Sequence, residues 1–364
     1  MSLSVGIVGL PNVGKSTLFN AILKKEQALS ANYPFATIEP NVGAINVPDS
    51  RLDVLASIIK EQDGILPPKV YASIEFIDIA GLIKGASKGE GLGNQFLANI
   101  RECDMILQVV RDFKDENIIR EQSLNPDNDT EIINSELIIK DLETLEKRLF
   151  SVGRDPKKQE ENQIINLYIE NLGKGAYAFD LREKITEKQY LEIIKPLFLL
   201  TDKDVVYVFN VDENDSRLTN DSPTTDIFKG KPVVYISAKT EFEISALNED
   251  EQSAYLAELG IKESGLNKIS RVCFEKLGLI SFLTAGVQEV RAWEIPKNST
   301  AVKAAGRIHT DFEKSFIKAE IISFSDYQTY KTKNKAKEAG KLRLEGKEYI
   351  MKDGDVVEFK IGAA

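Results

Sequence analysis

The residues that carry the clearest chemistry lie near the N-terminus. Gly9–Ser16 reads GLPNVGKS and fits the phosphate-binding pattern G-x-x-x-x-G-K-[ST]. Its glycines let backbone N–H groups turn inward around phosphate oxygens, and the start of the next helix adds the positive end of its dipole. A strand pattern, Val5–Val8, precedes the loop and a helical pattern, Ser16–Leu23, follows it, a context that a chance glycine-rich turn would lack. The nucleotide-binding residues expected here are Asn12, Val13, Gly14, Lys15, Ser16 and Thr17.

Two later segments complete the predicted phosphate and metal site. Asp78 follows an apolar strand pattern, and an aspartate at such a strand end holds Mg²⁺ through water in P-loop enzymes. Gly81 is expected to follow the γ-phosphate with its backbone N–H, and Thr37 is the best candidate to close on Mg²⁺ and the γ-phosphate. Lys15 would bridge the β- and γ-phosphates. The expected catalytic residues are Lys15, Thr37 and Gly81, and the expected metal ligands are Ser16, Thr37 and Asp78.

A third group of residues is expected to face the base of the nucleotide. Asn210–Glu213 reads NVDE after the buried-strand pattern Val205–Phe209, at the place where guanine-specific enzymes carry N-K-x-D. The aspartate of that motif accepts hydrogen bonds from guanine N1–H and the 2-amino group. Glu213 stands for that aspartate and Val211 for the lysine, so we expect ATP to bind better than GTP. An ordinary polar turn after a strand is the alternative interpretation.

The loop Ser237–Lys239 reads SAK and matches a segment whose backbone borders the base in these enzymes. Ser237, Ala238 and Lys239 are therefore expected to join Asn210, Val211 and Glu213 in the base site. Adenine needs an acceptor for its N6 amino group and a donor for N1. Asn210 or backbone groups near Val211 and Ser237 could supply them.

Composition excludes several classes of protein. The chain has 364 residues, enough for two or three domains, and a net charge of −10 that argues against a generally basic nucleic-acid wrapper. No apolar run reaches the roughly 18–20 residues of a membrane span. Cys103 and Cys273 cannot form a disulfide framework, so we expect a cytoplasmic protein with reduced thiols. His309 is the single histidine, which excludes His-based triads and most zinc centres.

Strand and helix patterns alternate along the chain and predict an α/β fold with a mostly parallel sheet. About ninety residues separate the strand pattern that ends near Val110 from the one that begins near Val205, far more than one crossover needs. The apolar spacing there predicts two long helices that form an antiparallel hairpin projecting from the sheet, although two ordinary packing helices are the alternative. The expected division is an NTPase domain at 1–125 and 201–279, a helical insertion at 126–200 and a C-terminal domain at 280–364.

The C-terminal segment differs from the rest in charge and pattern. Residues 280–364 hold 15 Lys and Arg against 12 Asp and Glu, so this segment is basic within an acidic chain. Asp353–Asp355 predicts a tight turn before the strand pattern Val356–Phe359, and a small β-rich module is expected. The stretch Lys331–Arg343 has six basic residues and one acidic residue, Glu338, which makes it a candidate for contacts with RNA phosphates.

Taken together, these motifs resemble the YchF/Obg-like ATPases, a branch of the Obg-related P-loop NTPases. The resemblance covers nearly the whole chain, including the altered base motif and the helical insertion. Its C-terminal part rests on Phe282–Gly286, Ala304–Phe312 and Gly340–Gly346, which look like the TGS domain of that family.

The resemblance implies a Mg²⁺-dependent nucleotidase that prefers ATP, binds ribosomes or their subunits and acts in translation or stress responses. Relatives with the Pro11-Asn12 pair can use the asparagine to bind K⁺, so Asn12 would either bind K⁺ or only brace its loop. Arg120 stands where relatives carry a histidine that has been discussed as catalytic, and no catalytic histidine is carried over. Leu82 replaces a water-orienting glutamine, so slow intrinsic hydrolysis is expected.

Two other functions remain open on the sequence. A nucleotide-gated ribosome-binding factor could share all these motifs while its turnover is incidental. A conventional GTPase is disfavoured by Val211 and Glu213. The helical insertion and the basic C-terminal domain are the expected contact regions for the ribosome, and no membrane partner is expected.

Overall fold

The chain folds into two compact units in the computed structural model. The structure describes residues 3–30, 41–79, 98–115, 125–153, 158–219, 226–228 and 230–362. One unit comprises residues 1–45 and 75–269, and the other comprises residues 46–74 and 270–364. The sequence analysis placed residues 46–74 in the NTPase domain, and the structure assigns them to the second unit instead.

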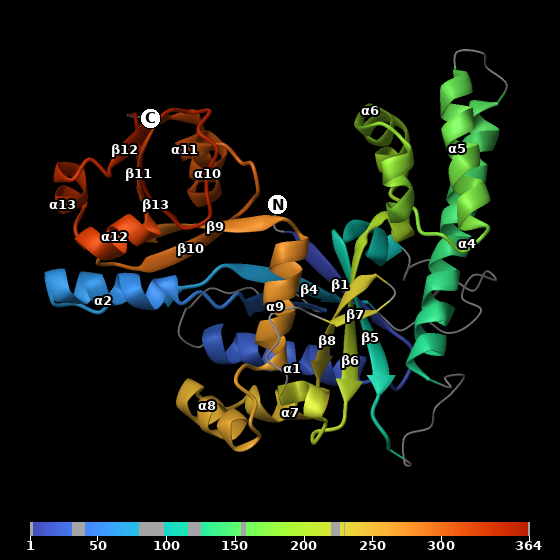
Figure 1. Cartoon of the computed structure of the whole chain (residues 1–364), viewed down its shortest axis with the longest axis horizontal. Helices are drawn as coiled ribbons and strands as arrows, with labels where there is room; N and C mark the ends of the chain where they lie inside the picture. The colour runs from blue at the N-terminus through green and yellow to red at the C-terminus, as the bar shows by residue number, and fades with distance from the viewer. Residues whose placement is uncertain are drawn as a thin grey trace. The chain divides into compact units, whose positions relative to one another are not determined.

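The first unit is organised around a sheet that has seven strands in the described residues, in the order β2-β4-β1-β5-β6-β8-β7 (Figure 1). Strands β4, β1, β5, β6 and β8 run parallel, and β7 is antiparallel to β8. This arrangement confirms the predicted mostly parallel α/β sheet. The strand bounds are β1 Ser4–Gly9, β2 Val42–Asn46, β4 Ser73–Asp78, β5 Met105–Asp112, β6 Asp204–Val211, β7 Asp226–Phe228 and β8 Lys231–Ile236.

Helices of the first unit begin close to the ends of these strands. Helix α1 follows β1 after a short loop, and α7 starts directly after β8, so both begin at the carboxyl edge of the sheet. Helices α1 and α7 pack against each other. The bounds are α1 Lys15–Ser30, α7 Ala238–Ile244, α8 Glu249–Glu258 and α9 Gly265–Lys276, the last of which continues into the second unit.

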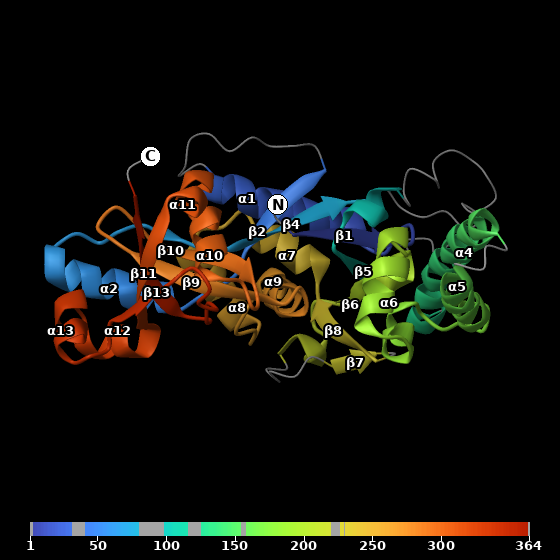
Figure 2. The same ribbon diagram turned by 90° about the horizontal axis from the view of Figure 1, so that it is seen from above.

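The predicted helical insertion forms a pair of helices, α4 (Pro126–Val152) and α5 (Gln159–Leu172). They lie side by side in both views, and their outer parts extend away from the sheet (Figures 1 and 2). Their shared core contains Leu145, Ile165 and Tyr168. Residues 179–202 add short helical turns, including α6 (Glu187–Gln189), which the sequence analysis did not predict.

The second unit contains a sheet that has six strands within the described ranges, in the order β12-β11-β13-β9-β10-β3. Helices flank this sheet, so the expected β-rich module is a mixed α/β unit. The strands are β3 Lys69–Val70, β9 Leu279–Ala285, β10 Val290–Pro296, β11 Phe316–Ser323, β12 Arg343–Glu345 and β13 Asp355–Ile361. The helices are α2 Arg51–Asp63, α10 Ala301–Ile308, α11 Thr310–Lys314, α12 Phe324–Tyr330 and α13 Lys333–Glu338.

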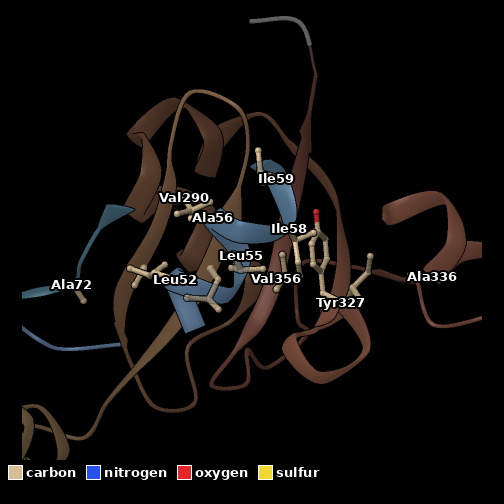
Figure 3. Packing of buried hydrophobic residues seen from close by; sticks show 13 residues of the cluster. Leu52, Leu55, Ala56, Ile58, Ile59, Ala72, Val290, Tyr327, Ala336 and Val356 are labelled. Carbon is tan, nitrogen blue, oxygen red and sulfur yellow. The ribbon is translucent and has the colours of Figure 1, made fainter. Parts of the chain in front are cut away.

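Helix α2 explains why residues 46–74 belong to the second unit. Its apolar side, with Leu52, Leu55 and Ile58, packs against Val290, Val356 and other residues of the C-terminal segment (Figure 3). Leu52 and Leu55 are fully buried in this cluster. Periodicity in the sequence shows that α2 has an apolar side, but it does not show which sheet covers that side.

Among the described residues, no helix is both long enough and apolar enough to cross a membrane.

Candidate functional site

A cavity of about 870 Å³ lies where the carboxyl ends of β1, β5, β6 and β8 meet in the first unit. Ligands of open α/β sheets bind at this edge, because the strands end there and the following loops surround a crevice. The cavity is lined by Leu10, Pro11, Asn12, Gly14, Lys15, Ser16, Thr17, Phe113, Lys114, Asp115, Asn210, Val211, Asp212, Glu213, Asn214, Ser237, Ala238 and Lys239. The structure thus brings the predicted phosphate loop and both predicted base loops around one space.

Two residues of the phosphate loop have left-handed backbone conformations. Gly14 has φ = 93° and Asn12 has φ = 62°, a region that glycine and asparagine tolerate best. A Cβ on Gly14 would lie 2.2 Å from the Nδ2 atom of Asn210. The glycine is therefore required by its backbone angle and by the close approach of the Asn210 amide.

Lys15 and Asp78 meet beside the phosphate loop. The Lys15 ammonium donates a hydrogen bond to the Asp78 carboxylate, and both side chains are largely buried. The parallel register pairs Asp78 with Ile7, which places the end of β4 next to the strand that leads into the loop. Ser16 lines the cavity one residue after Lys15. A hydroxyl and a carboxylate are oxygen groups of the class that Mg²⁺ prefers, so Ser16 and Asp78 fit a magnesium site.

Asn210 joins the phosphate loop to the SAK loop. Its Nδ2 atom donates to the backbone oxygen of Val13 at 3.0 Å, and its Oδ1 atom accepts from the backbone N–H of Ala238 at 2.9 Å. The Asn210 side chain is buried in this position. Both polar atoms of the amide are therefore engaged by the protein. The amide of Asn210 therefore holds two loops together, and its expected contact with adenine stays a prediction.

The side chains of Ser237 and Val211 also make contacts within the protein. The Ser237 hydroxyl caps helix α7 by accepting from the backbone N–H of Thr240 at 3.2 Å. Val211 is only 2% exposed and packs in an apolar cluster with Tyr207 and Phe209, so its side chain contributes little to the cavity wall. Val211 therefore supplies only a small part of the apolar surface that was expected to contact the base.

Glu213 and Lys239 form an ion pair at the rim of the cavity. The Lys239 Nζ atom lies 3.2 Å from the Glu213 carboxylate. Their hydrogen bond raises the pKa of the Lys239 ammonium above its ordinary value. Both side chains reach solvent, so the pair is worth little in stability. Its importance lies in position, because it engages the carboxylate that replaces the guanine-reading aspartate.

The sequence analysis missed the cavity wall that follows β5. Phe113, Lys114 and Asp115 line the cavity beside the base loop that follows β6. The Arg111 guanidinium lies over the Phe113 ring at 4.4 Å, and the Lys114 N–H donates to the Asp212 carboxylate at 3.3 Å. No motif marks these residues. Their place directly after a central parallel strand is the signal that could have found them.

Several predicted residues lie outside the described part of the chain. These are Thr37, Gly81, Leu82 and Arg120. Their expected roles therefore remain predictions from the sequence.

Comparison with protein families agrees with this architecture. Residues 4–140 match a family described as "50S ribosome-binding GTPase". Residues 279–362 match a C-terminal YchF GTPase family described as "Protein of unknown function (DUF933)". The assignment of this segment to the TGS domain therefore stays a prediction.

Full-length relatives extend the match to the entire chain. The chain is 47% identical to a protein of Escherichia coli O157:H7 named ribosome-binding ATPase YchF, with 99% of each chain covered. It is 45% identical to the Bacillus subtilis (strain 168) protein of the same name, again over 99% of both. A solved structure of the Schizosaccharomyces pombe YchF GTPase superposes with a TM-score of 0.83 at 39% identity, covering 99% of this chain and 98% of that one. With its phosphate loop, its altered base loop and its parallel sheet, this chain belongs to the YchF family of P-loop nucleoside triphosphatases.

Proposed function

We propose that the protein is a ribosome-binding ATPase that acts as a nucleotide-dependent switch and hydrolyses ATP to ADP and phosphate. The single observation that carries this proposal is the cavity that brings Lys15, Ser16 and the two base loops together. The full-length relatives that are named ribosome-binding ATPases support the ribosomal part. A role in translation or in stress regulation follows from ribosome binding.

The phosphate end of the cavity supports nucleotide hydrolysis. Lys15 would bind the β- and γ-phosphates, Thr37 and Gly81 would approach the γ-phosphate, and Ser16, Thr37 and Asp78 would hold Mg²⁺. Bound Mg²⁺ would neutralise charge that develops on the transferred phosphoryl group. The ion pair between Lys15 and Asp78 supports this assignment, because it brings a phosphate ligand and a metal ligand together.

The base end of the cavity supports a preference for ATP over GTP. Guanine needs an acceptor for N1–H and for its 2-amino group. Glu213 is one methylene longer than the aspartate of N-K-x-D, so its carboxylate cannot occupy the same place without movement of the backbone, and it lies at the rim of the cavity beside Lys239. A polar group that loses its partner in a binding site costs about 1–3 kcal/mol. Adenine presents one donor group and one acceptor, which backbone groups near Val211 and Ser237 can satisfy. The Phe113 ring adds an apolar surface to the cavity wall on which a base could stack.

Potassium is a further cofactor that we propose for Asn12. The residue is exposed in the loop, lines the cavity and has a left-handed backbone conformation. A bound K⁺ would supply positive charge near the phosphates. The alternative role, bracing of the loop, predicts equal ATP turnover in K⁺ and Na⁺ buffers.

The expected ribosome contact through Lys331–Arg343 needs revision in its details. Four of its basic side chains form ion pairs within the second unit: Lys331 with Glu61, Lys333 with Glu320, Lys341 with Asp326 and Arg343 with Asp355. The stretch is therefore much less positive than its sequence indicates. Within the described chain, no ion pair involves Lys335 or Lys337, which leaves these two as candidates for contacts with RNA phosphates.

Two assays test the proposed function. Phosphate release from ATP, measured with and without ribosomes, should show slow turnover that ribosomes change; turnover that is absent in both conditions would contradict an enzyme and favour a gated binding factor. Sedimentation with ribosomes should weaken steeply as salt rises. Deleting residues 280–364 would be a poor test, because it uncovers the apolar side of α2.

Point variants are the better test of the ribosomal surface. We expect the double variant Lys335→Glu/Lys337→Glu to reduce sedimentation with ribosomes. The matched control is Lys297→Glu/Lys314→Glu, which reverses two exposed charges elsewhere in the same unit. Equal binding of the two variants would rule out helix α13 as a contact.

A further inference from the structure

Helix α9 begins on a buried carboxylate that comes from helix α7. Glu241 is 4% exposed, and its two oxygens accept from the backbone N–H groups of Gly265 at 2.6 Å and Leu266 at 3.2 Å. Unpaired N–H groups at the start of a helix need such acceptors, and a negative charge there also faces the positive end of the dipole. Glu241 thus binds the first turn of α9. It lies four residues after Ser237, which lines the nucleotide cavity.

The same turn of α9 contacts strand β8, which ends beside the nucleotide cavity, and helix α1, which begins there. A Cβ on Gly265 would lie 2.4 Å from Ile236, the last residue of β8. Lys25 of helix α1 donates to the Asn267 side chain at 2.7 Å. Helix α1 begins at Lys15 and α7 begins at Ala238, and both of these residues line the cavity.

Helices α1 and α7 are also joined to each other. The Lys24 ammonium lies 3.5 Å above the Phe242 ring. At the cavity, Asn210 ties the loop before α1 to the first residue of α7. A ligand that binds the phosphate loop and the SAK loop together therefore restrains the two helices that hold the start of α9.

We propose that Glu241 is a positioning residue that couples nucleotide binding to helix α9. The inference rests on the proposed function only in requiring that ATP binds in the cavity. ATP that bridges α1 and α7 reduces their relative motion, and the restraint passes through Glu241 to the N–H groups of Gly265 and Leu266. Helix α9 runs on to Lys276, and β9 of the second unit follows at Leu279, so the restraint is transmitted along the chain into the second unit.

Hydrogen–deuterium exchange of the full-length protein, with and without Mg²⁺ and ATP, tests this coupling. In the wild type, we expect ATP to slow exchange in two regions: residues 12–18 at the phosphate loop, and the first turns of α9 at residues 266–272. We expect exchange to slow by about fivefold or more. About fivefold is the low end of the factor by which a ligand at one site typically changes binding at another. In Glu241→Gln, which loses the charge and one strong acceptor, slowing should persist at the phosphate loop and disappear at α9.

Two further variants make the test specific. Glu243→Gln changes an exposed residue of the same helix in the same way and should behave as the wild type. Asn267→Ala removes the partner of Lys25, and it should reduce the slowing at α9 if Glu241→Gln does not fold.

The outcomes separate this inference from the proposed function. Slowing at the phosphate loop without slowing at α9 in the wild type would overturn the coupling and leave ATP binding intact. Full slowing at α9 in folded Glu241→Gln or in Asn267→Ala would also overturn it. Absence of slowing at the phosphate loop, with no ATP binding by calorimetry, would overturn the proposed function and the coupling together.

Discussion

Asn210 and Glu213 lie three positions apart within one base motif, yet their side chains make different contacts. Asn210 is buried and uses its amide to join two loops. Glu213 stays at the rim and pairs with Lys239. One residue therefore joins two loops of the cavity, and we propose that the other sets which hydrogen-bonding groups a base would meet there.

Replacing Asn210 tests the first of these roles. Asn210→Ala leaves the Val13 carbonyl and the Ala238 N–H without their partner, and each buried group left unsatisfied costs about 1–3 kcal/mol. We expect the free energy of unfolding to fall by about 2–6 kcal/mol. Urea denaturation measures this change, with the exposed Asn214→Ala as the control. Equal stability of the two variants would show that the Asn210 amide does not join the loops.

Lys15 tests the phosphate end of the site. Lys15→Ala removes a charged hydrogen-bond donor from the loop, and such bonds contribute about 1.5–3 kcal/mol. ATP affinity should fall about 10- to 100-fold in a calorimetric titration. Lys60→Ala, an exposed residue of helix α2, should leave the affinity unchanged. Unchanged affinity in Lys15→Ala would remove the residue from the site.

At the scale of elements, the helical pair α4–α5 is fastened to the chain by a buried carboxylate. Asp141 accepts from the N–H groups of Leu200 at 2.7 Å and Thr201 at 2.8 Å, and from the Thr201 hydroxyl at 2.6 Å. Nearby, the Asn134 amide lies 3.3 Å from the Tyr207 hydroxyl, which connects α4 to strand β6. These bonds fix the base of the helical pair.

An amide at position 141 should loosen this attachment. In Asp141→Asn, an NH₂ group replaces one carboxylate oxygen. This NH₂ group then faces the N–H or hydroxyl donors that the oxygen had accepted from. We expect a loss of about 1–3 kcal/mol in the free energy of unfolding, measured by urea denaturation. Glu146→Gln makes a similar change at an exposed site on the same helix and should cost far less. A loss as small as that of the control would mean that Asp141 does not hold the pair in place.

An ion-pair cluster in the second unit predicts a pH dependence. The hydrogen bond from Lys333 lowers the pKa of the Glu320 carboxyl, against an opposing contribution from burial. A lowered pKa means that this pair stabilises the fold above the unfolded-state pKa of about 4.3, and that the stabilisation is lost as pH falls through the folded-state value. Lys333→Met should therefore lose less stability than the wild type between about pH 6 and pH 3.5.

Urea denaturation at the two pH values measures this difference. Lys335→Met, on the same helix, is the control and should keep the acid sensitivity of the wild type. An identical acid-induced loss in Lys333→Met and the wild type would contradict a stabilising role for this ion pair.

Much of the first unit was predictable because its signals are local. The phosphate loop needs a strand, a glycine-rich turn and a helix in immediate succession, and the two base loops follow strands with strong apolar patterns. The cavity wall at Phe113–Asp115 was not predictable in this way, because it is defined by the order of strands in space. The partners of Lys331–Arg343 were hidden for the same reason, since one of them, Glu61, lies about 270 residues away in sequence.

At the scale of the whole molecule, the chain enters the second unit twice. Residues 46–74 leave the first unit, supply α2 and β3 to the second, and return to form β4. A single boundary in the sequence therefore cannot separate the two units, because each unit contains two segments of the chain. It also means that the segment between the predicted Thr37 and Asp78 of the nucleotide site passes through the second unit.

Competition binding shows whether the cavity of this YchF protein is an ATP site. A labelled ATP analogue is bound to the full-length protein with Mg²⁺, and unlabelled ATP and GTP are titrated side by side. Glu213 is one methylene longer than the aspartate that reads guanine, and it lies at the rim of the cavity beside Lys239, so we predict displacement by ATP at a concentration about tenfold or more below that of GTP. Displacement by GTP at an equal or lower concentration than ATP would contradict the account.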